Sequence, residues 1–231
     1  MKENIILLHG ALGTKSNLQE LSDLLQVNFN VHSFNFRGHG GLSFLKNEMT
    51  MSGLAEEIGE FIENNAIYQP SIFGYSMGGY AALKYASKNH KRVKNIITLG
   101  TKFDWSPSST QNSIEVMNLK QWKEKNPAFV EVLKQLHQPT DIQILITVTQ
   151  NMLRHLSKSD FLSDEELHAI QCPVHLMLGD QDKMVSVEES EIISSKIPKS
   201  NLIFLKDTKH PIELVNKILL SNHLNEILNA N

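Results

Sequence analysis

The segment Gly74-Tyr75-Ser76-Met77-Gly78-Gly79 fits the pattern G-x-S-x-G, in which a serine stands two positions from a glycine on either side. A serine on so sharp a turn needs small neighbours, because the flanking backbones approach closely, and Gly74 and Gly78 meet that need. The hydroxyl of Ser76 would then project above a sheet, where it could attack a carbonyl carbon. The segment therefore predicts a nucleophilic serine.

A serine hydroxyl is a poor nucleophile until a base takes its proton, and that base needs a third group to fix its tautomer. Of ten histidines, His210 follows the last apolar run and precedes Pro211, so we expect it at the same sheet edge as Ser76. His9 and His39 also lie in predicted loops, where we expect them to bond backbone in tight turns. Five others are expected to be solvated: His90, His137, His155, His168 and His223.

The third group would be a carboxylate, and the segment Gly179-Asp180-Gln181-Asp182, which follows the penultimate apolar run, offers two. The turn at Gly179 lets either aspartate reach across the sheet edge, and spacing alone does not choose between them. Asp207 lies three positions before His210, and we interpret it as the partner of a local turn. The order Ser, Asp, His along the chain is one of the known orders for such a constellation.

Attack on a carbonyl also requires two backbone N–H groups that hold the developing oxyanion. One is expected from Met77, the residue after the nucleophile, and the other from the loop of residues 9–14, whose glycines expose amides. Residues 10–16 of the same region loosely match a phosphate-binding loop. They lack its Gly-Lys pair and have only two residues between their glycines, so the oxyanion interpretation is favoured.

Short apolar runs rich in Ile, Val and Phe alternate with longer segments of helical periodicity, which predicts an α/β fold with a mostly parallel sheet. The expected strands are Asn4–Leu8, Val31–Phe36, Ser71–Gly74, Val93–Leu99, Pro173–Leu178 and Asn201–Leu205. The expected helices are Ser16–Val27, Met51–Asn64, Met77–Lys88, Val187–Ser195 and Pro211–Leu228, with Pro211 in the first helical position.

About 70 residues between Leu99 and Pro173 exceed an ordinary connection in such a fold. They contain a polar linker, Ser106–Ser113, and three helical segments: Ser113–Lys125, Asn126–His137 and Asp141–Leu156. We interpret this interval as a lid over one edge of the sheet, because lids close over sites and exclude water. The alternative is a helical ornament that only completes a core.

Composition excludes several classes of protein. The 231 residues are 41% hydrophobic and 20% charged, with a net charge of -3, so a disordered chain is excluded and no basic stripe for nucleic acid is present. The apolar run at Ile5–Leu8 is too short for a secretory signal, and no run is long enough for a membrane span. The single cysteine, Cys172, cannot form an internal disulfide. We expect a soluble, cytoplasmic protein.

The whole chain resembles the α/β-hydrolase superfamily, in its lid-bearing branch. The matching elements are His9-Gly10-Ala11-Leu12-Gly13, Phe36-Arg37-Gly38-His39-Gly40, Gly74–Gly79, Gly179–Asp182 and His210. The resemblance implies Ser76 as nucleophile, His210 as base, Asp182 in preference to Asp180 as acid, and Ala11 with Met77 as oxyanion donors. Departures are Asn35 for the usual aspartate, Lys209 for the usual glycine before the histidine, and no strand before Asn4.

The expected architecture is a doubly wound, mostly parallel sheet of about six strands, with a helical lid inserted after the fifth strand. Residues 1–105 and 171–231 would form the core and residues 106–170 the lid, within one domain. We expect an apolar substrate pocket built from seven side chains: Leu12, Phe103, Trp105, Trp122, Met152, Leu153 and Met184.

The predicted activity is that of a serine hydrolase acting on a small or medium carboxylic ester or thioester, without metal or other cofactor. Its partner would be a small acyl substrate, with neither nucleic acid nor membrane involved. Two alternatives stay open: C–C bond hydrolysis or a lyase reaction with the same triad, and a binding protein without turnover. Lys102 or Arg154 could recognise a carboxylate, although a solvated position is the simpler interpretation of each.

Overall fold

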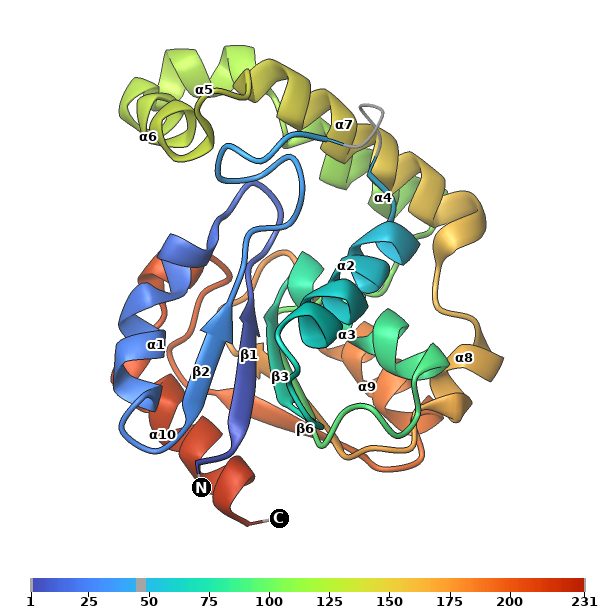
Figure 1. The fold of residues 1–231 in the computed structure, drawn as a ribbon. Helices are drawn as coiled ribbons and strands as arrows, with labels where there is room; N and C mark the ends of the chain where they lie inside the picture. Colours follow the sequence, from blue (N-terminus) through green and yellow to red (C-terminus); the bar gives the residue numbers. More distant parts are fainter. Residues whose placement is uncertain (1, 45–48, 231) are drawn as a thin grey trace.

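The computed structural model describes residues 2–44 and 49–230, and these form a six-stranded parallel sheet with helices on both faces (Figure 1). The strands are β1 (Asn4–Leu8), β2 (Asn30–Ser33), β3 (Ser71–Tyr75), β4 (Ile96–Leu99), β5 (Val174–Gly179) and β6 (Ser200–Leu205). Their order across the sheet is β2-β1-β3-β4-β5-β6, and every neighbouring pair is parallel. The predicted fold class is confirmed.

Strand β1 shows why both faces of the sheet are covered. Ile5 and Leu7 belong to one buried cluster and Ile6 and Leu8 to another, because successive side chains of a strand point to opposite faces. A strand that is apolar throughout therefore needs helices on both sides. The first face carries α1 (Gln19–Leu25) and α10 (Lys217–Asn229); the second carries α2 (Met51–Asn64), α3 (Met77–Lys88) and α9 (Val187–Lys196) (Figure 1).

A helical insertion, residues 106–170, lies between β4 and β5. It contains α4 (Pro107–Glu115), α5 (Leu119–Lys125), α6 (Pro127–His137), α7 (Ile142–His155), a π-helical turn (Leu156–Asp160) and α8 (Asp164–Ala169). Figure 1 shows α4 to α7 stacked beyond the carboxyl ends of the strands, while α8 lies beside α3. The insertion follows the fourth strand, so the prediction that it follows the fifth is wrong: the strand at Asn4 is the first of this sheet.

Three local expectations are also wrong. Residues 107–113 are not a linker but part of α4, which Pro107 begins in the first helical position. Residues 116–118 separate α4 from α5, because Asn118 caps α5 by accepting a hydrogen bond from the Gln121 amide. Pro211 precedes a short 3₁₀ turn rather than starting the last helix; α10 begins after Asn216, whose side chain accepts from the Leu219 amide.

The end of the insertion is tied to the core by a buried ionic cluster. Lys84 of α3 is 4% exposed, and its Nζ lies 2.9 Å from Glu166 Oε2 and 3.8 Å from Asp160 Oδ1. Ser52 of α2 donates to Asp160 through both its backbone N–H and its hydroxyl. Because buried charges are costly unless paired, this cluster fixes where the chain returns from the insertion to the sheet.

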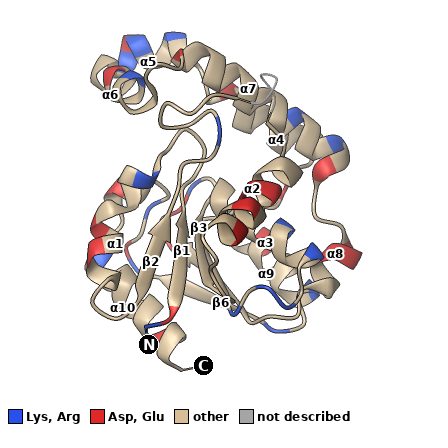
Figure 2. Ribbon diagram, viewed as in Figure 1, with Lys and Arg blue, Asp and Glu red and all other residues tan. Residues whose placement is uncertain are grey.

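Charged side chains lie on the outer faces of the helices, with both signs interspersed (Figure 2). The most visible group of Lys and Arg in this view is on α5, where Glu124 accompanies Lys120, Lys123 and Lys125. Within residues 2–44 and 49–230, none of the helices combines the length and the apolar character that crossing a bilayer requires.

Candidate active site

Ser76 occupies a strained turn between β3 and α3. Its φ angle is 51°, in the left-handed region that residues with a side chain seldom adopt. The neighbouring glycines make this turn possible: a Cβ on Gly74 would lie 2.4 Å from Gly79 Cα, and one on Gly78 would lie 2.7 Å from the carbonyl oxygens of Leu8 and His9. The G-x-S-x-G spacing is thus a steric requirement of this turn.

Two hydrogen bonds hold the backbone of Ser76 in place. Its N–H donates to the Leu99 carbonyl over 2.9 Å, and its own carbonyl accepts from the Thr101 hydroxyl over 3.0 Å. Both partners come from the end of β4 and the loop after it. The strained turn is therefore supported by the neighbouring strand, which keeps the side chain of Ser76 at the carboxyl edge of the sheet.

His210 and Asp182 form a close pair at the same edge. His210 Nδ1 lies 2.7 Å from Asp182 Oδ2, and their side chains are only 10% and 2% exposed. The other carboxylate oxygen, Oδ1, accepts from the amides of Met184 and Val185 over 2.8 and 3.1 Å. With the carboxylate accepting at Oδ2, Nδ1 of a neutral His210 carries the proton and Nε2 is left as the basic nitrogen.

The structure distinguishes the aspartates that spacing left open. Asp180 turns away from His210, and its Oδ1 accepts from the Thr208 amide over 3.1 Å. Asp207 has a φ of 53°, and its Oδ1 accepts from Gln181 Nε2 over 3.2 Å rather than from its own turn. Both aspartates thus join the loop after β5 to the loop after β6, which brings Asp182 and His210 together.

The amides of Ala11 and Met77 border the same space. Both residues line the cavity that contains Ser76, and neither amide donates a hydrogen bond within the part of the chain that the structure describes. Met77 is the first residue of α3, where N–H groups lack helical partners and the helix dipole favours negative charge. The two amides are therefore available to a developing oxyanion.

A buried histidine cluster, His9, His39 and His137, supports the loop that carries Ala11. His9 Nδ1–H donates to the Gly10 carbonyl and Nε2 accepts from the Phe36 amide. His137 of α6 accepts from the Gly40 amide at Nδ1 and donates from Nε2 to the Leu12 carbonyl over 3.0 Å. The expectation that His137 is solvated is wrong, because the insertion buries it completely against the core.

These bonds assign neutral tautomers, and burial favours the neutral forms. Desolvation lowers the pKa of His9 to about 4 and lowers the pKa of His39 and His137 below the ordinary value of 6.5. His39 Nδ1 donates to the Arg37 carbonyl over 3.3 Å, so His9 and His39 both bond backbone as expected. His137 has a role that its place in a helical segment did not indicate: it joins the insertion to the loop that carries Ala11 and Leu12.

Ser76 and His210 open into a cavity of about 720 Å³ between the sheet edge and the insertion. Six of the seven predicted pocket side chains line it: Leu12, Trp105, Trp122, Met152, Leu153 and Met184. Phe103 does not line this cavity: it borders a separate depression next to α8 and α9, and its ring centroid lies 6.0 Å from that of Tyr80. Arg154 is exposed and bonds Asn151, also outside the cavity.

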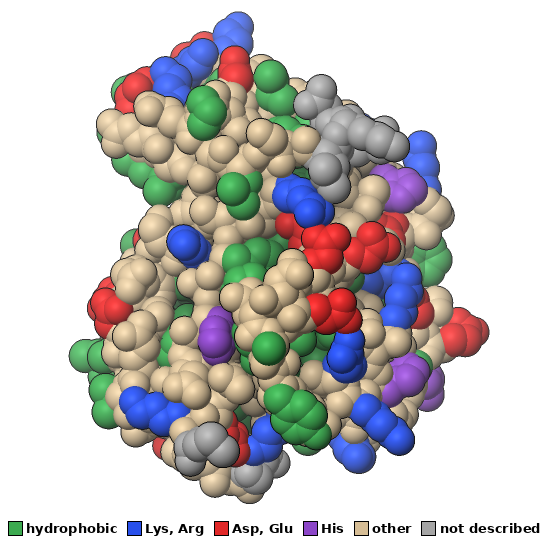
Figure 3. Space-filling view, in the orientation of Figure 1, with side chains coloured by type: hydrophobic (Ala, Val, Ile, Leu, Met, Phe, Trp, Pro, Cys, Tyr) green, Lys and Arg blue, Asp and Glu red, His purple; other side chains and the backbone are tan. Residues whose placement is uncertain are grey.

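The cavity reaches the surface between the insertion and two 3₁₀ turns, Lys15–Leu18 and Ile212–Leu214. Phe129 and Val132 of α6 line one side and Asn17 and Leu214 the other. In Figure 3 the outline of the molecule is indented at the left, between the region of α6 and the region of α1. The wall is mostly apolar, which suits an acyl chain or ring more than a strongly hydrated ligand.

Tyr75 is a site residue that the sequence did not reveal. Its hydroxyl donates to the backbone carbonyl of His210 over 3.0 Å, and its ring lies 5.5 Å from the imidazole. Burial raises the pKa of this hydroxyl above its ordinary value, so it remains a donor. The available signal was its place directly before Ser76, although nothing in the pattern assigned it a partner.

A parallel sheet with a strained serine after its third strand and a His–Asp pair after later strands is the arrangement of one class of enzymes, the α/β hydrolases. The family model for the alpha/beta hydrolase fold matches residues 3–160. The chain therefore belongs to the α/β-hydrolase fold family, and the protein is a hydrolase.

Known relatives show how varied this family is. The chain is 24% identical over 246 residues to proline iminopeptidase PfmaB of Pestalotiopsis fici, covering 91% of this chain and 86% of that relative. A thermophilic esterase of Thermogutta terrifontis has a TM-score of 0.76 at 22% identity, with 100% and 90% of the two chains covered. The 2-hydroxy-6-oxo-6-phenylhexa-2,4-dienoate hydrolase of Rhodococcus sp. strain RHA1 has a TM-score of 0.79 at 18% identity, covering 99% and 91%. These two structures share the fold.

Proposed function

We propose that the protein cleaves a carboxylic ester or thioester of small or medium size through a Ser76-His210-Asp182 triad and an acyl-enzyme. The main support is the 2.7 Å pair of His210 and Asp182, because His210 borders the same cavity as the strained Ser76. A structural serine has no need of a left-handed backbone or of a buried His–Asp pair beside it.

The geometry supports a two-step reaction. His210 Nε2 takes the hydroxyl proton as Ser76 Oγ attacks the carbonyl carbon, and the amides of Ala11 and Met77 stabilise the oxyanion. His210 then gives the proton to the leaving alcohol or thiol, which leaves an acyl group on Ser76. Water, activated by the same imidazole, releases the acid. Asp182 keeps Nδ1 protonated and stabilises the imidazolium in both steps.

The cavity and the insertion suggest the size of the substrate. A volume of about 720 Å³ lies within the range of pockets for small molecules. Residues 106–170 would act as a lid, because α6 and α7 contribute four apolar side chains to the cavity wall: Phe129, Leu133, Met152 and Leu153. Specificity would therefore reside largely in the insertion.

An activity-based fluorophosphonate tests the nucleophile. The folded protein should be labelled on Ser76, and Ser76→Ala should abolish labelling without changing the melting temperature by more than a few degrees. Labelling that persists in Ser76→Ala would overturn the proposal. A panel of p-nitrophenyl esters and thioesters of increasing acyl length then tests the bond cleaved; labelling without turnover of any member would favour C–C chemistry at the same triad.

A further inference from the structure

Lys102 is a cation in the wall of a mostly apolar cavity, whose lining also includes the carboxylate of Glu213. It lies in the loop between β4 and α4, and within the described ranges it is the only Lys or Arg that lines the cavity containing Ser76. The preceding residue, Thr101, bonds the carbonyl of Ser76 over 3.0 Å, so this loop passes directly beside the nucleophile. The side chain of Lys102 therefore lines the same cavity as Ser76.

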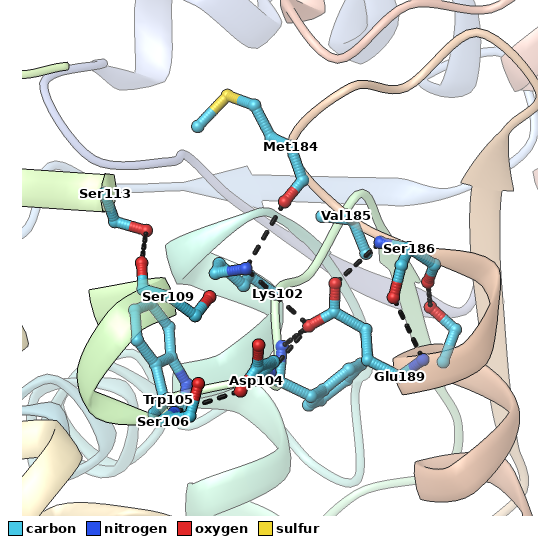
Figure 4. Close-up of polar contacts among 12 residues, drawn as sticks. Lys102, Asp104, Trp105, Ser106, Ser109, Ser113, Met184, Val185, Ser186 and Glu189 are labelled. Atoms are coloured by element: carbon cyan, nitrogen blue, oxygen red, sulfur yellow. Dashed lines mark hydrogen bonds and ion pairs between the residues drawn. The ribbon is translucent and has the colours of Figure 1, made fainter. Parts of the chain in front are cut away.

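The ammonium of Lys102 has only long contacts within the protein (Figure 4). Its Nζ lies 3.4 Å from the Met184 carbonyl oxygen and 3.9 Å from Glu189 Oε2. Charge-assisted hydrogen bonds of an ammonium are normally about 2.7 to 2.9 Å, and the group has three N–H donors to satisfy. Lys102 is therefore incompletely bonded by the described residues around it.

Glu189 neutralises this charge but bonds elsewhere. Its Oε2 accepts from the amides of Phe103 and Asp104 over 2.8 and 2.6 Å, and its Oε1 accepts from the Ser186 amide over 2.6 Å. The carboxylate is 8% exposed and fixed by these three bonds (Figure 4). It therefore offsets the cost of a cation in an apolar wall without taking up the donors of Lys102.

Lys84 is a structural lysine of the same molecule, and its ammonium contacts can be compared with those of Lys102. Its Nζ contacts Glu166 at 2.9 Å and the Phe161 carbonyl at 3.1 Å, and its side chain is 5% exposed. The side chain of Lys102 is 17% exposed and makes no contact of that length. The donors of Lys102 are therefore available to a partner outside the protein.

We propose that Lys102 is a specificity-determining residue that binds an ionised carboxylate of the substrate, so that the preferred ester carries a second, acidic group a few methylenes from the scissile carbonyl. This inference rests on the proposed esterase function, because it assigns a substrate class to the same cavity. The carboxylate would accept from Nζ, while the apolar wall contacts the methylenes between the two groups.

The experiment compares matched acidic and neutral esters in a pH-stat. Monoethyl adipate carries its charge on the acyl side, and ethyl hexanoate is its neutral partner. The ester 4-butyryloxybutanoate carries its charge on the alcohol side, and butyl butyrate is its neutral partner. Lys102→Met should lower kcat/KM for the recognised acidic ester about 10- to 100-fold, the factor that a charge-assisted hydrogen bond supplies, and change the neutral partner by less than about 3-fold. Lys102→Arg should retain most of the acidic activity, and the exposed Lys206→Met serves as the control.

The outcomes separate this inference from the proposed function. If Lys102→Met lowers the acidic and neutral esters equally, Lys102 only supports the loop and the inference is wrong. If the wild-type protein cleaves only neutral esters, the inference is also wrong while the esterase function stands. If no ester is cleaved and Ser76 is not labelled by a fluorophosphonate, the proposed function itself fails.

Discussion

Replacing Asp182 by asparagine tests the roles assigned to the His–Asp pair, and the surrounding bonds fix the result. The amides of Met184 and Val185 both donate to Asp182 Oδ1, so the carbonyl oxygen of an asparagine must stay at that position. Its NH₂ group then replaces Oδ2 and faces His210 Nδ1, 2.7 Å away. Because NH₂ is a donor, Nδ1 must become the acceptor, and the proton moves to Nε2.

An imidazole with its proton on Nε2 cannot take the proton of Ser76. In serine hydrolases with such a triad, the same reversal of the tautomer lowers kcat about 10⁴-fold, which corresponds to about 5 kcal/mol of lost transition-state stabilisation. We expect Asp182→Asn to lower kcat for p-nitrophenyl butyrate by about 10³- to 10⁴-fold with little change in melting temperature. The rate of fluorophosphonate labelling should fall in parallel.

Asp180→Asn is the matched control, because it changes a carboxylate two positions away whose Oδ1 accepts from the Thr208 amide instead of contacting His210. Its kcat should stay within about 3-fold of the wild type. If Asp182→Asn retains more than a tenth of the wild-type kcat, or if Asp180→Asn suffers the larger loss, Asp182 is not the residue that orients His210.

Two further predictions concern Tyr75 and the buried histidine cluster. Tyr75→Phe removes the bond to the His210 carbonyl and should lower kcat about 3- to 10-fold at unchanged KM, as measured by steady-state kinetics; an unchanged kcat would show that the bond does not position His210. Burial lowers the pKa of His9 to about 4, whereas the unfolded chain titrates near 6.5, so between these values only the unfolded state takes up this proton. The free energy of unfolding should therefore fall as the pH falls from 7 to 4, by about 3 kcal/mol from His9 alone, with further loss from His39 and His137. Urea unfolding at a series of pH values measures this slope, and equal stability at pH 7 and pH 4.5 would contradict it.

Features with a local physical cause were predictable from the sequence. Gly74 has such a cause, because a Cβ there would lie 2.4 Å from Gly79 Cα within the same turn, and the motif located the turn correctly. Gly78 is required by the neighbouring strand, since its Cβ would lie 2.7 Å from the Leu8 and His9 carbonyl oxygens. Strand β1 was equally visible, because Ile5 and Ile6 are buried on opposite faces of a doubly covered sheet and leave an unbroken apolar run. The edge strand β2, which has no fully buried residue, covers Asn30–Ser33 rather than the predicted Val31–Phe36.

Features that depend on the tertiary arrangement were not predictable. Which of Asp180 and Asp182 meets His210 depends on where the loop after β6 lies. Asp180 helps to hold that loop by accepting a hydrogen bond from the Thr208 amide. His137 and Phe103 were misassigned for the same reason: α6 buries the first against Leu12, and the bond from the Phe103 amide to Glu189 accompanies the turn of the second toward Tyr80. The incomplete bonding of Lys102 is visible only once Glu189 is seen bound to other amides.

If Ser76 forms a covalent acyl intermediate, acid quenching during turnover should trap it. The protein is mixed with p-nitrophenyl butyrate, quenched within the first turnovers, digested and analysed by peptide mass spectrometry. We expect one butyryl group on the peptide containing Ser76, and none on that peptide in Ser76→Ala. Turnover of the ester with no adduct on Ser76, or with the adduct on another residue, would contradict the acyl-enzyme mechanism.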